Sequence, residues 1–248
     1  MDNGGIAGSN IGNIENCKNK GKIDGGYETG GIVGAQYENG KISRCVNEGI
    51  FIETFATYHK GGILGLNSGN GIVEYCSNLS DIEFYWDSSH GGIVGYNNDS
   101  GIIQYCFNKG NLNQERYSIG GIAGTNVATI QYCYNTGNIS ITKGNSSTAA
   151  AYGIGSGGNI KNCYNIGRVE GLQGGRPYQI AGTDATIQNS YYLGTNSDDE
   201  TCKDLEFMKT QDFVDLLNAD NEEIFCMDED VINDGYPILS WQSEKSKK

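Results

Sequence analysis

The chain has 248 residues, including 38 Gly and only 2 Pro, and its 17 Lys and Arg against 30 Asp and Glu give a net charge of −13. This acidic balance, with no basic stripe, excludes a nucleic-acid interface and disfavours anionic membranes as partners. No apolar run is long enough to span a bilayer, so we expect no membrane insertion. The Gly content does not indicate disorder, because periodic Ile, Val and Tyr supply a core face.

A cassette of about 30 residues recurs seven times along the chain, starting at Gly4. Each copy opens with Gly-Gly-Ile-Val/Ala-Gly, or a decayed form of it, and continues with Ile-x-x-Cys-x-Asn-x-Gly. In the last copy Ser190 replaces the Cys and Tyr192 the Asn, and Ser80 replaces the closing Gly of the third. A fixed period of this size is typical of stacked, solenoid architectures. Because the chain begins inside a repeat, we expect it to be a fragment of a longer protein.

Two columns of residues define the cassette. The Cys column holds six members one repeat apart, which fits neither a disulfide framework nor the close Cys pairs of zinc sites. We expect both columns to stack inside the solenoid, the thiols as small apolar groups and the amides at an inner corner. The columns are Cys17, Cys45, Cys76, Cys106, Cys133 and Cys163, and Asn19, Asn47, Asn78, Asn108, Asn135 and Asn165. Cys202 and Cys226 lie outside this register and are a candidate disulfide pair.

Short β-prone segments separated by Gly, Asn and Ser predict strands broken by turns, and helical periodicity is absent before residue ~200. We therefore expect an all-β fold, a parallel β-helix of about seven coils spaced about 4.8 Å apart, with right-handed crossovers. The Ile and the Cys three residues later must both point inward, which breaks strict alternation and predicts a bulge or corner between them. The Gly two residues after the Asn is expected at a corner with positive φ.

Composition changes near residue 197, so we divide the chain into a solenoid, residues 1–196, and a capping segment, residues 197–248. Thr210 is the predicted N-cap of a short helix, residues 211–218, that buries Phe213, Leu216 and Leu217. Together with an aromatic-rich strand, this helix forms a small α/β cap that we expect to cover the last open coil. The tail, residues 245–248, is predicted to be disordered.

Gly-Gly-Ile-Val-Gly followed by Ile-x-Asn-Cys-Tyr-Asn-x-Gly resembles the GLUG-type repeats of large bacterial surface proteins. The closing segments, residues 208–214 and 233–239, look like those that end such arrays. The resemblance implies a secreted or wall-attached protein of a Gram-positive anaerobe, in which such repeats accompany adhesins, carbohydrate-active enzymes and IgA-directed metalloproteases. It carries over no catalytic residue.

The first candidate site is an aromatic surface beside the Cys column. If these rings point outward, they form a stripe along the last coils that suits the C–H faces of sugars. Alternatively, the rings stabilise the sheet as a cross-strand ladder, or they receive the C-terminal helix. The residues are Tyr105, Phe107, Tyr132, Tyr134, Tyr164, Tyr191 and Tyr192.

The second candidate site lies in the long connections of coils two to four. Stacking is expected to bring Glu53 near Glu83 and His59 near His90, with Tyr58 and Trp86 close by. Paired carboxylates about one coil apart have the separation of a retaining glycosidase pair, although Glu alternating with apolar residues is also typical of a solvated face. The acidic runs at 198–200 and 228–230 do not have the spacing of a calcium loop.

We therefore expect a non-enzymatic extracellular module, secreted or attached to the cell wall, that binds a glycan or surface protein of host or bacterium or acts as a spacer. The alternative is a polysaccharide hydrolase or lyase that uses acidic residues on the solenoid face. We expect no metal or cofactor.

Overall fold

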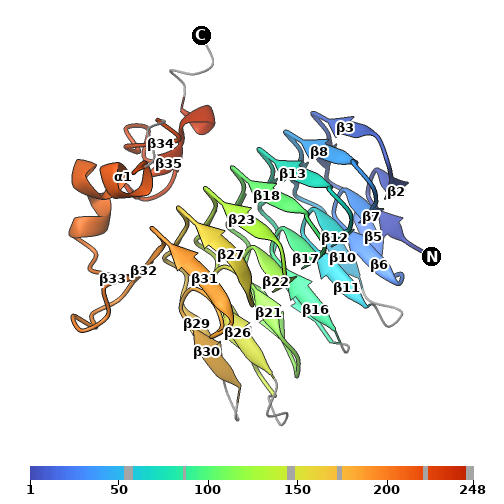
Figure 1. Cartoon of the computed structure of the whole chain (residues 1–248). Helices are drawn as coiled ribbons and strands as arrows, with labels where there is room; N and C mark the ends of the chain where they lie inside the picture. The colour runs from blue at the N-terminus through green and yellow to red at the C-terminus, as the bar shows by residue number, and fades with distance from the viewer. Residues whose placement is uncertain (53–57, 86–87, 144–148, 172–174, 220–222, 244–248) are drawn as a thin grey trace.

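The computed structural model describes residues 1–52, 58–85, 88–143, 149–171, 175–219 and 223–243. Strands of successive cassettes pair in parallel, so the chain winds into a β-solenoid of about seven coils (Figure 1), as the repeat predicts. Two of the candidate residues, Glu53 and Trp86, and the tail 245–248 lie outside the described residues.

Each coil contributes one short strand to each of up to five parallel sheets, which we number in chain order. Sheet 1 contains β1 (Asn3–Gly4), β6 (Glu28–Gly30), β11 (His59–Gly61), β16 (Ser89–Gly91), β21 (Ile119–Gly120), β26 (Ala150–Tyr152) and β30 (Arg176–Tyr178). Sheet 2 contains β2 (Ala7–Asn10), β7 (Val33–Gln36), β12 (Leu64–Asn67), β17 (Val94–Asn97) and β22 (Ala123–Asn126). Sheet 3 contains β3 (Asn13–Glu15), β8 (Lys41–Ser43), β13 (Ile72–Glu74), β18 (Ile102–Gln104), β23 (Thr129–Gln131), β27 (Gly158–Lys161) and β31 (Ala185–Gln188).

The remaining two sheets complete the coil. Sheet 4 contains β4 (Lys18–Asn19), β9 (Val46–Asn47), β14 (Ser77–Asn78), β19 (Phe107–Asn108), β24 (Tyr134–Asn135), β28 (Tyr164–Asn165), β32 (Tyr191–Leu193) and β33 (Cys202–Lys203). Sheet 5 has two parts, one with β5 (Lys22–Asp24) and β10 (Ile50–Ile52), the other with β15 (Ile82–Phe84), β20 (Leu112–Gln114), β25 (Ile139–Ile141) and β29 (Val169–Gly171). Because β33 pairs with β32, sheet 4 continues past residue 196.

The Cys column forms a continuous thiol ladder inside the main core. The backbone N–H of Cys45, Cys76, Cys106 and Cys133 each donates to the Sγ of the Cys one coil further on, at 3.4 Å. Ser190 takes the same place in the seventh coil, where its Oγ accepts from the N–H of Cys163 at 3.1 Å. Burial raises the pKa of Cys76, Cys106 and Cys133 well above the ordinary thiol value, so these three thiols are neutral. Cys202 and Cys226, the candidate pair, are not joined by a disulfide.

The Asn column of sheet 4, here the first amide ladder, is confirmed as an inner stack. From Asn19 to Asn165, each Nδ2 donates to the Oδ1 of the Asn in the next coil at 2.8–3.0 Å. Within a coil, the Oδ1 of Asn19, Asn47 and Asn78 accepts from the backbone N–H two residues on. In the later coils the Nδ2 also donates to the carbonyl oxygen at that position, as Asn108 does to Gly110. Each buried amide therefore bonds both its own turn and its neighbour, which removes the desolvation penalty of burial.

A second amide ladder, which the sequence analysis did not identify, runs along sheet 2. Asn10 donates to Gln36, Gln36 to Asn67, Asn67 to Asn97 and Asn97 to Asn126, all at 2.8–3.0 Å. All five side chains are less than one-tenth exposed. The solenoid is thus held by two amide ladders and one thiol ladder that run parallel to its axis.

The corner between the inward Ile and Cys is confirmed, and its cause is one left-handed residue just before each Cys. These residues have φ between 45° and 54°, a region that costs a non-Gly residue energy and holds it at a defined corner. They are Asn16, Arg44, Tyr75, Tyr105, Tyr132, Asn162 and Asn189.

The positive φ predicted for the Gly two residues after each Asn is wrong. The described Gly residues with positive φ are Gly69, Gly158 and Gly235, none of them at this position. Gly is required there by space: a Cβ on Gly49 would lie 2.1 Å from Nδ2 of Asn19 and 2.6 Å from the carbonyl oxygen of Gly21. At Gly49 the first amide ladder thus approaches the backbone too closely for a side chain, whereas the third coil has Ser80 at the equivalent position.

A smaller core lies between sheets 1 and 5, and its buried polar residues include Lys60 and His90. Lys60 and His90 are 0% exposed and face each other in adjacent strands. The Lys60 Nζ lies 5.6 Å from the ring centroid of Phe51 and 5.2 Å from that of Phe84, on which His90 stacks at 4.5 Å. Burial lowers the pKa of Lys60 to about 7.

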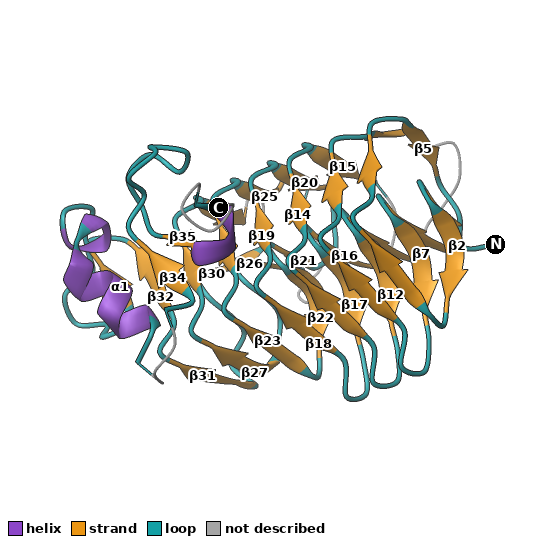
Figure 2. Cartoon of the chain, turned by 90° about the horizontal axis from the view of Figure 1, so that it is seen from above, coloured by secondary structure: helices purple, strands orange, loops and turns teal. Residues whose placement is uncertain are grey.

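The C-terminal cap consists of η1 (Phe207–Lys209), α1 (Gln211–Leu217), β34 (Phe225–Cys226), β35 (Ile238–Leu239) and η2 (Ser240–Gln242), with β34 and β35 antiparallel. Thr210 caps α1 as predicted, since its side chain accepts from the N–H of Phe213. Phe213, Val214 and Leu217 are buried, whereas Leu216 is only half-buried. The cap also packs on the outer face of sheet 4 rather than covering the last coil alone, and Figure 2 shows α1 beside β32 at one end of the stack.

Replacing Asn108 with Ala should destabilise the protein by roughly 2–3 kcal/mol, because the Nδ2 of Asn78 and the Oδ1 of Asn135 each lose a buried partner. Asn70→Ala is the matched control, since that amide is exposed and bonds only to the exposed Asn39. Urea denaturation followed by circular dichroism measures both variants. Equal losses would contradict the stabilising role of the ladder.

Lys60→Met should stabilise the protein most at low pH. Between pH 7 and 10 the unfolded chain holds a proton on Lys60 that the folded chain has lost, so this residue's contribution to stability rises with pH. The advantage of the Met variant should therefore shrink by roughly 1.4 kcal/mol per pH unit from pH 7.5 to 9.5. Urea titrations across this range measure it, and Lys22→Met, at an exposed position, should show no such slope.

Candidate functional site

The cap covers the outward aromatic row of sheet 4. Phe107, Tyr134 and Tyr164 stack at 5.0 Å between centroids, and their side chains are 6%, 0% and 0% exposed. The Tyr134 hydroxyl donates to Oε1 of Gln242 at 3.0 Å, and that of Tyr164 donates to the Pro237 carbonyl and accepts from Asn233. Burial raises the pKa of both phenols.

These three residues therefore cannot form the ligand stripe, and the alternative that the C-terminal helix docks on them is what the structure shows. The physical reason is that α1 must bury its own apolar face, and Phe213 does so edge-on against Tyr164 and Tyr191. Tyr192 points inward, 9% exposed, and its hydroxyl donates to Asp199 at 3.0 Å.

Tyr105 and Tyr132 belong to a second aromatic row at the left-handed corners. Tyr75, Tyr105 and Tyr132 stack at 4.9 and 5.6 Å and are half-buried. Trp241 of the cap donates its Nε1–H to the carbonyl oxygen of Tyr105 at 3.2 Å. The rings thus also serve as part of the contact between cap and solenoid.

The predicted proximity of His59 and His90 is wrong. His59 pairs with Ser89, and His90 pairs with Lys60, so the two His residues are one register position apart and point to opposite faces. The error arises because His59 precedes its Gly-Gly by two residues and His90 by one. His59 instead places Nδ1 2.8 Å from Oε2 of Glu28, and its neighbour Tyr58 stacks on Tyr27 at 5.3 Å.

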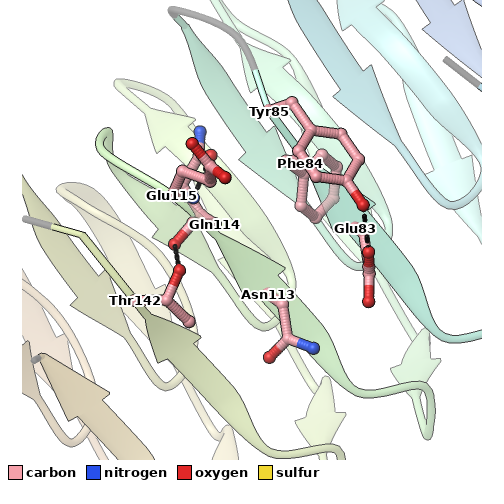
Figure 3. Close-up of a pocket in the computed structure, with 7 residues that line it drawn as sticks. All are labelled: Glu83, Phe84, Tyr85, Asn113, Gln114, Glu115 and Thr142. Atoms are coloured by element: carbon pink, nitrogen blue, oxygen red, sulfur yellow. Dashed lines mark hydrogen bonds between the residues drawn. The ribbon is translucent and has the colours of Figure 1, made fainter.

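Glu83 lies in a shallow pocket of about 270 Å³ on the outer face of sheet 5 (Figure 3). We call it the Glu83 pocket, and β15, β20 and the residue after β25 build it, because outward positions of adjacent coils stack side by side. It is lined by Glu83, Phe84, Tyr85, Asn113, Gln114, Glu115 and Thr142.

Hydrogen bonds hold the polar groups of the Glu83 pocket in place. The Tyr85 hydroxyl donates to the carboxylate of Glu83, which raises the pKa of the phenol. The Nζ of Lys143 lies 2.6 Å from a carboxylate oxygen of Glu115. The Oδ1 of Asn113 accepts from the Ser140 hydroxyl, so the amide NH₂ group of Asn113 faces away from Ser140. Figure 3 shows Tyr85 and Glu83 on one side of the pocket and Glu115 and Thr142 on the other. The pocket thus offers both acceptors and donors around one aromatic ring.

The sequence analysis missed Tyr85, Asn113, Glu115 and Thr142 as members of this site. Aligning Ile82-Glu83-Phe84 with Leu112-Asn113-Gln114 and Ile139-Ser140-Ile141 would have placed them together, since each triplet alternates in the same way.

Within the described ranges, no group of three or more His, Cys, Asp or Glu is arranged to hold a metal ion. The same residues contain no helix long and apolar enough to cross a membrane.

Phe213→Ala should destabilise the cap by about 3–5 kcal/mol, because this ring contacts Tyr164, Tyr191 and Phe207 at zero exposure. Asp215→Ala on the exposed side of α1 should change stability by no more than about 0.5 kcal/mol. Amide hydrogen exchange measures the effect, with faster exchange expected in residues 204–243 of the Phe213 variant. Unchanged exchange there would show that the aromatic row does not hold the cap.

The GLUG motif matches the chain at residues 115–140, which include the fifth Gly-Gly block and the Cys133–Asn135 segment. The chain matches no curated protein and no solved structure. Since the other cassettes stack on this one in the same register, the motif and the fold together describe a repeat module built as a β-solenoid.

Proposed function

We propose that this chain is a non-enzymatic binding module of a bacterial surface protein, which holds a hydroxyl-rich saccharide in the Glu83 pocket. The observation that carries the proposal is the clustering of Glu83, Tyr85, Asn113, Glu115 and Thr142 on one solvent-facing patch. Vicinal hydroxyls both donate and accept hydrogen bonds, so they need carboxylates and amide donors side by side. Tyr85 adds an exposed ring against which the C–H face of a sugar can pack.

The rigid frame supports this role. The pocket lies on three consecutive coils whose backbone spacing is fixed by parallel pairing, so its polar groups are pre-organised before a ligand arrives. A solenoid also separates its two ends, which suits a module that displays binding surfaces or spaces other domains along a cell-surface protein. Extracellular location and a glycan or surface-protein partner are parts of this proposal.

Hydrolysis or lysis of a polysaccharide is the weaker alternative. A glycosidase acid retains its proton because it is buried in an apolar pocket. Glu83 is exposed and accepts from a phenol, and Glu115 is ion-paired with Lys143, so neither carboxyl group lies in an apolar pocket. Two carboxylates of this kind serve as hydrogen-bond acceptors for sugar hydroxyls.

A glycan array of neutral bacterial and host oligosaccharides tests the proposal, followed by calorimetry on the strongest hit. Glu83→Gln and Tyr85→Ala should each lower affinity at least tenfold, whereas Glu206→Gln on the exposed surface of the cap should leave it unchanged. Release of reducing ends that Glu83→Gln abolishes would establish the enzymatic alternative instead. Absence of binding to every saccharide would leave the spacer role.

A further inference from the structure

A second hollow lies on a different face of the molecule, where the cap ends on the solenoid. It has a volume of about 460 Å³, within the range of ligand sites, and is lined by Arg44, Val46, Tyr75 and Trp241. We call it the Arg44 pocket. Its residues come from coils two and three and from η2, and none of them lines the Glu83 pocket.

A change of side-chain size along sheet 4 creates the Arg44 pocket. Towards the N-terminus, the outward row of this sheet changes from Tyr134 and Phe107 to Ser77 and Val46. The cap rests on the large rings, so a space opens beneath its edge where the row becomes small. Trp241 forms the wall at this edge, because its ring centroid lies 5.8 Å from that of Phe107 and 6.2 Å from that of Tyr75.

The aromatic wall is fixed in position without a ligand. Trp241 donates its Nε1–H to the carbonyl oxygen of Tyr105. The next residue, Gln242, is 9% exposed, and its Oε1 accepts from both the Tyr134 hydroxyl and the N–H of Leu239. Tyr75 is held by stacking on Tyr105 at 4.9 Å. Pre-organised rings lose little conformational entropy when a ligand packs on them.

Arg44 supplies a cation in the lining of the pocket. The Cζ atom of its guanidinium lies 5.2 Å from the ring centroid of Tyr75, which is a cation–π contact. The N–H donors lie in the guanidinium plane, in the fork that matches a carboxylate. Among the described residues, the neighbouring cations Lys18 and Lys41 have carboxylate partners, Glu48 and Glu74, whereas Arg44 is exposed and has no ion-pair partner.

The charge around this pocket differs from that of the whole chain. On the outer side of sheets 3 and 4 in the first three coils, four cations face three carboxylates, and 4 − 3 gives +1, against −13 overall. The residues counted are Lys18, Lys20, Lys41, Arg44, Glu15, Glu48 and Glu74. An anion that most of the surface repels is tolerated here.

We propose that the Arg44 pocket binds an acidic sugar, with the sugar carboxylate on the guanidinium of Arg44 and the ring against Tyr75 and Trp241. A carboxylate alone would not use the aromatic wall, and a neutral sugar would not use the unpaired cation. A uronic or sialic acid residue presents both a carboxylate and a C–H face, so it fits the two features together.

The experiment measures calorimetric binding of three probes: a galacturonic acid tetramer, a hyaluronan tetrasaccharide and sialyllactose. At least one should bind the full chain, its methyl ester should bind at least tenfold more weakly, and affinity should fall with added salt. Arg44→Gln should reduce affinity at least tenfold, and Arg44→Lys should restore only part of it, because Lys cannot form the bidentate pair.

Lys143→Gln, at the other pocket, is the matched control and should leave acidic-sugar binding unchanged. Arg44 is exposed, so its variants should fold normally, and a circular dichroism melt checks this. Binding of none of the three acids, equal binding of acid and ester, or insensitivity to Arg44→Gln would each overturn the proposal. Loss of neutral-saccharide binding in Glu83→Gln concerns only the other pocket, so the two proposals fail separately.

Discussion

The structure depends on one constraint: the backbone, amide and thiol groups that a coil buries find partners in the coil above or below. Sheets of short parallel strands satisfy the backbone, while the two amide ladders and the thiol ladder satisfy the corners. A coil on its own would leave these groups unpaired in an apolar interior, which is why such coils are stable only in a stack. The repeated residues of the cassette are therefore those that face the next coil.

The cap follows from the same stacking. Side chains on the outer face of sheet 4 stack in the same register as the strands, so three large rings in successive cassettes become one flat aromatic surface. Such a surface needs cover, and α1 with its neighbouring strands supplies it through Phe213, Phe225 and the bonds to Gln242. The Arg44 pocket exists because this surface ends at Phe107 in the fourth coil, where the cap edge and the change to smaller side chains coincide.

Much of the fold was predictable from the sequence, because most ladder positions hold the same residue type in successive copies. The Cys and Asn columns and the corner before each Cys could be read from period and polarity alone. The second amide ladder is harder to read from the sequence. Gln36 replaces Asn in its column, and the residues next to Asn10 and Asn67 are only loosely similar. The reason for the Gly after most of these Asn residues could not be predicted either. The side chain of Asn19 approaches the backbone of Gly49, and the sequence shows only that a Gly is present.

The candidate sites were harder to predict, because they depend on register and on contacts between distant segments. One residue of offset separates His59 from His90, and it shows only when each His is counted from its own Gly-Gly. The burial of Tyr134 and Tyr164 depends on Gln242 and Pro237, about 70 to 110 residues away in sequence. By contrast, Glu83 was identified because an outward Glu between two apolar residues is visible locally, whereas its partners Asn113 and Thr142 belong to other coils.

The amide ladders also give the solenoid a direction. The N–H of Gly12 or Gly49 fixes which end of the amide is the oxygen within its own coil, so every Nδ2 or Nε2 is left to point towards the C-terminus. Both ladders run this way over five and six residues, and their side-chain dipoles add along the axis. The stack is therefore an electrically oriented rod whose positive side-chain end lies at the C-terminal coils, opposite in sense to an α-helix. Two such arrays brought end to end are complementary in one orientation and mismatched in the other.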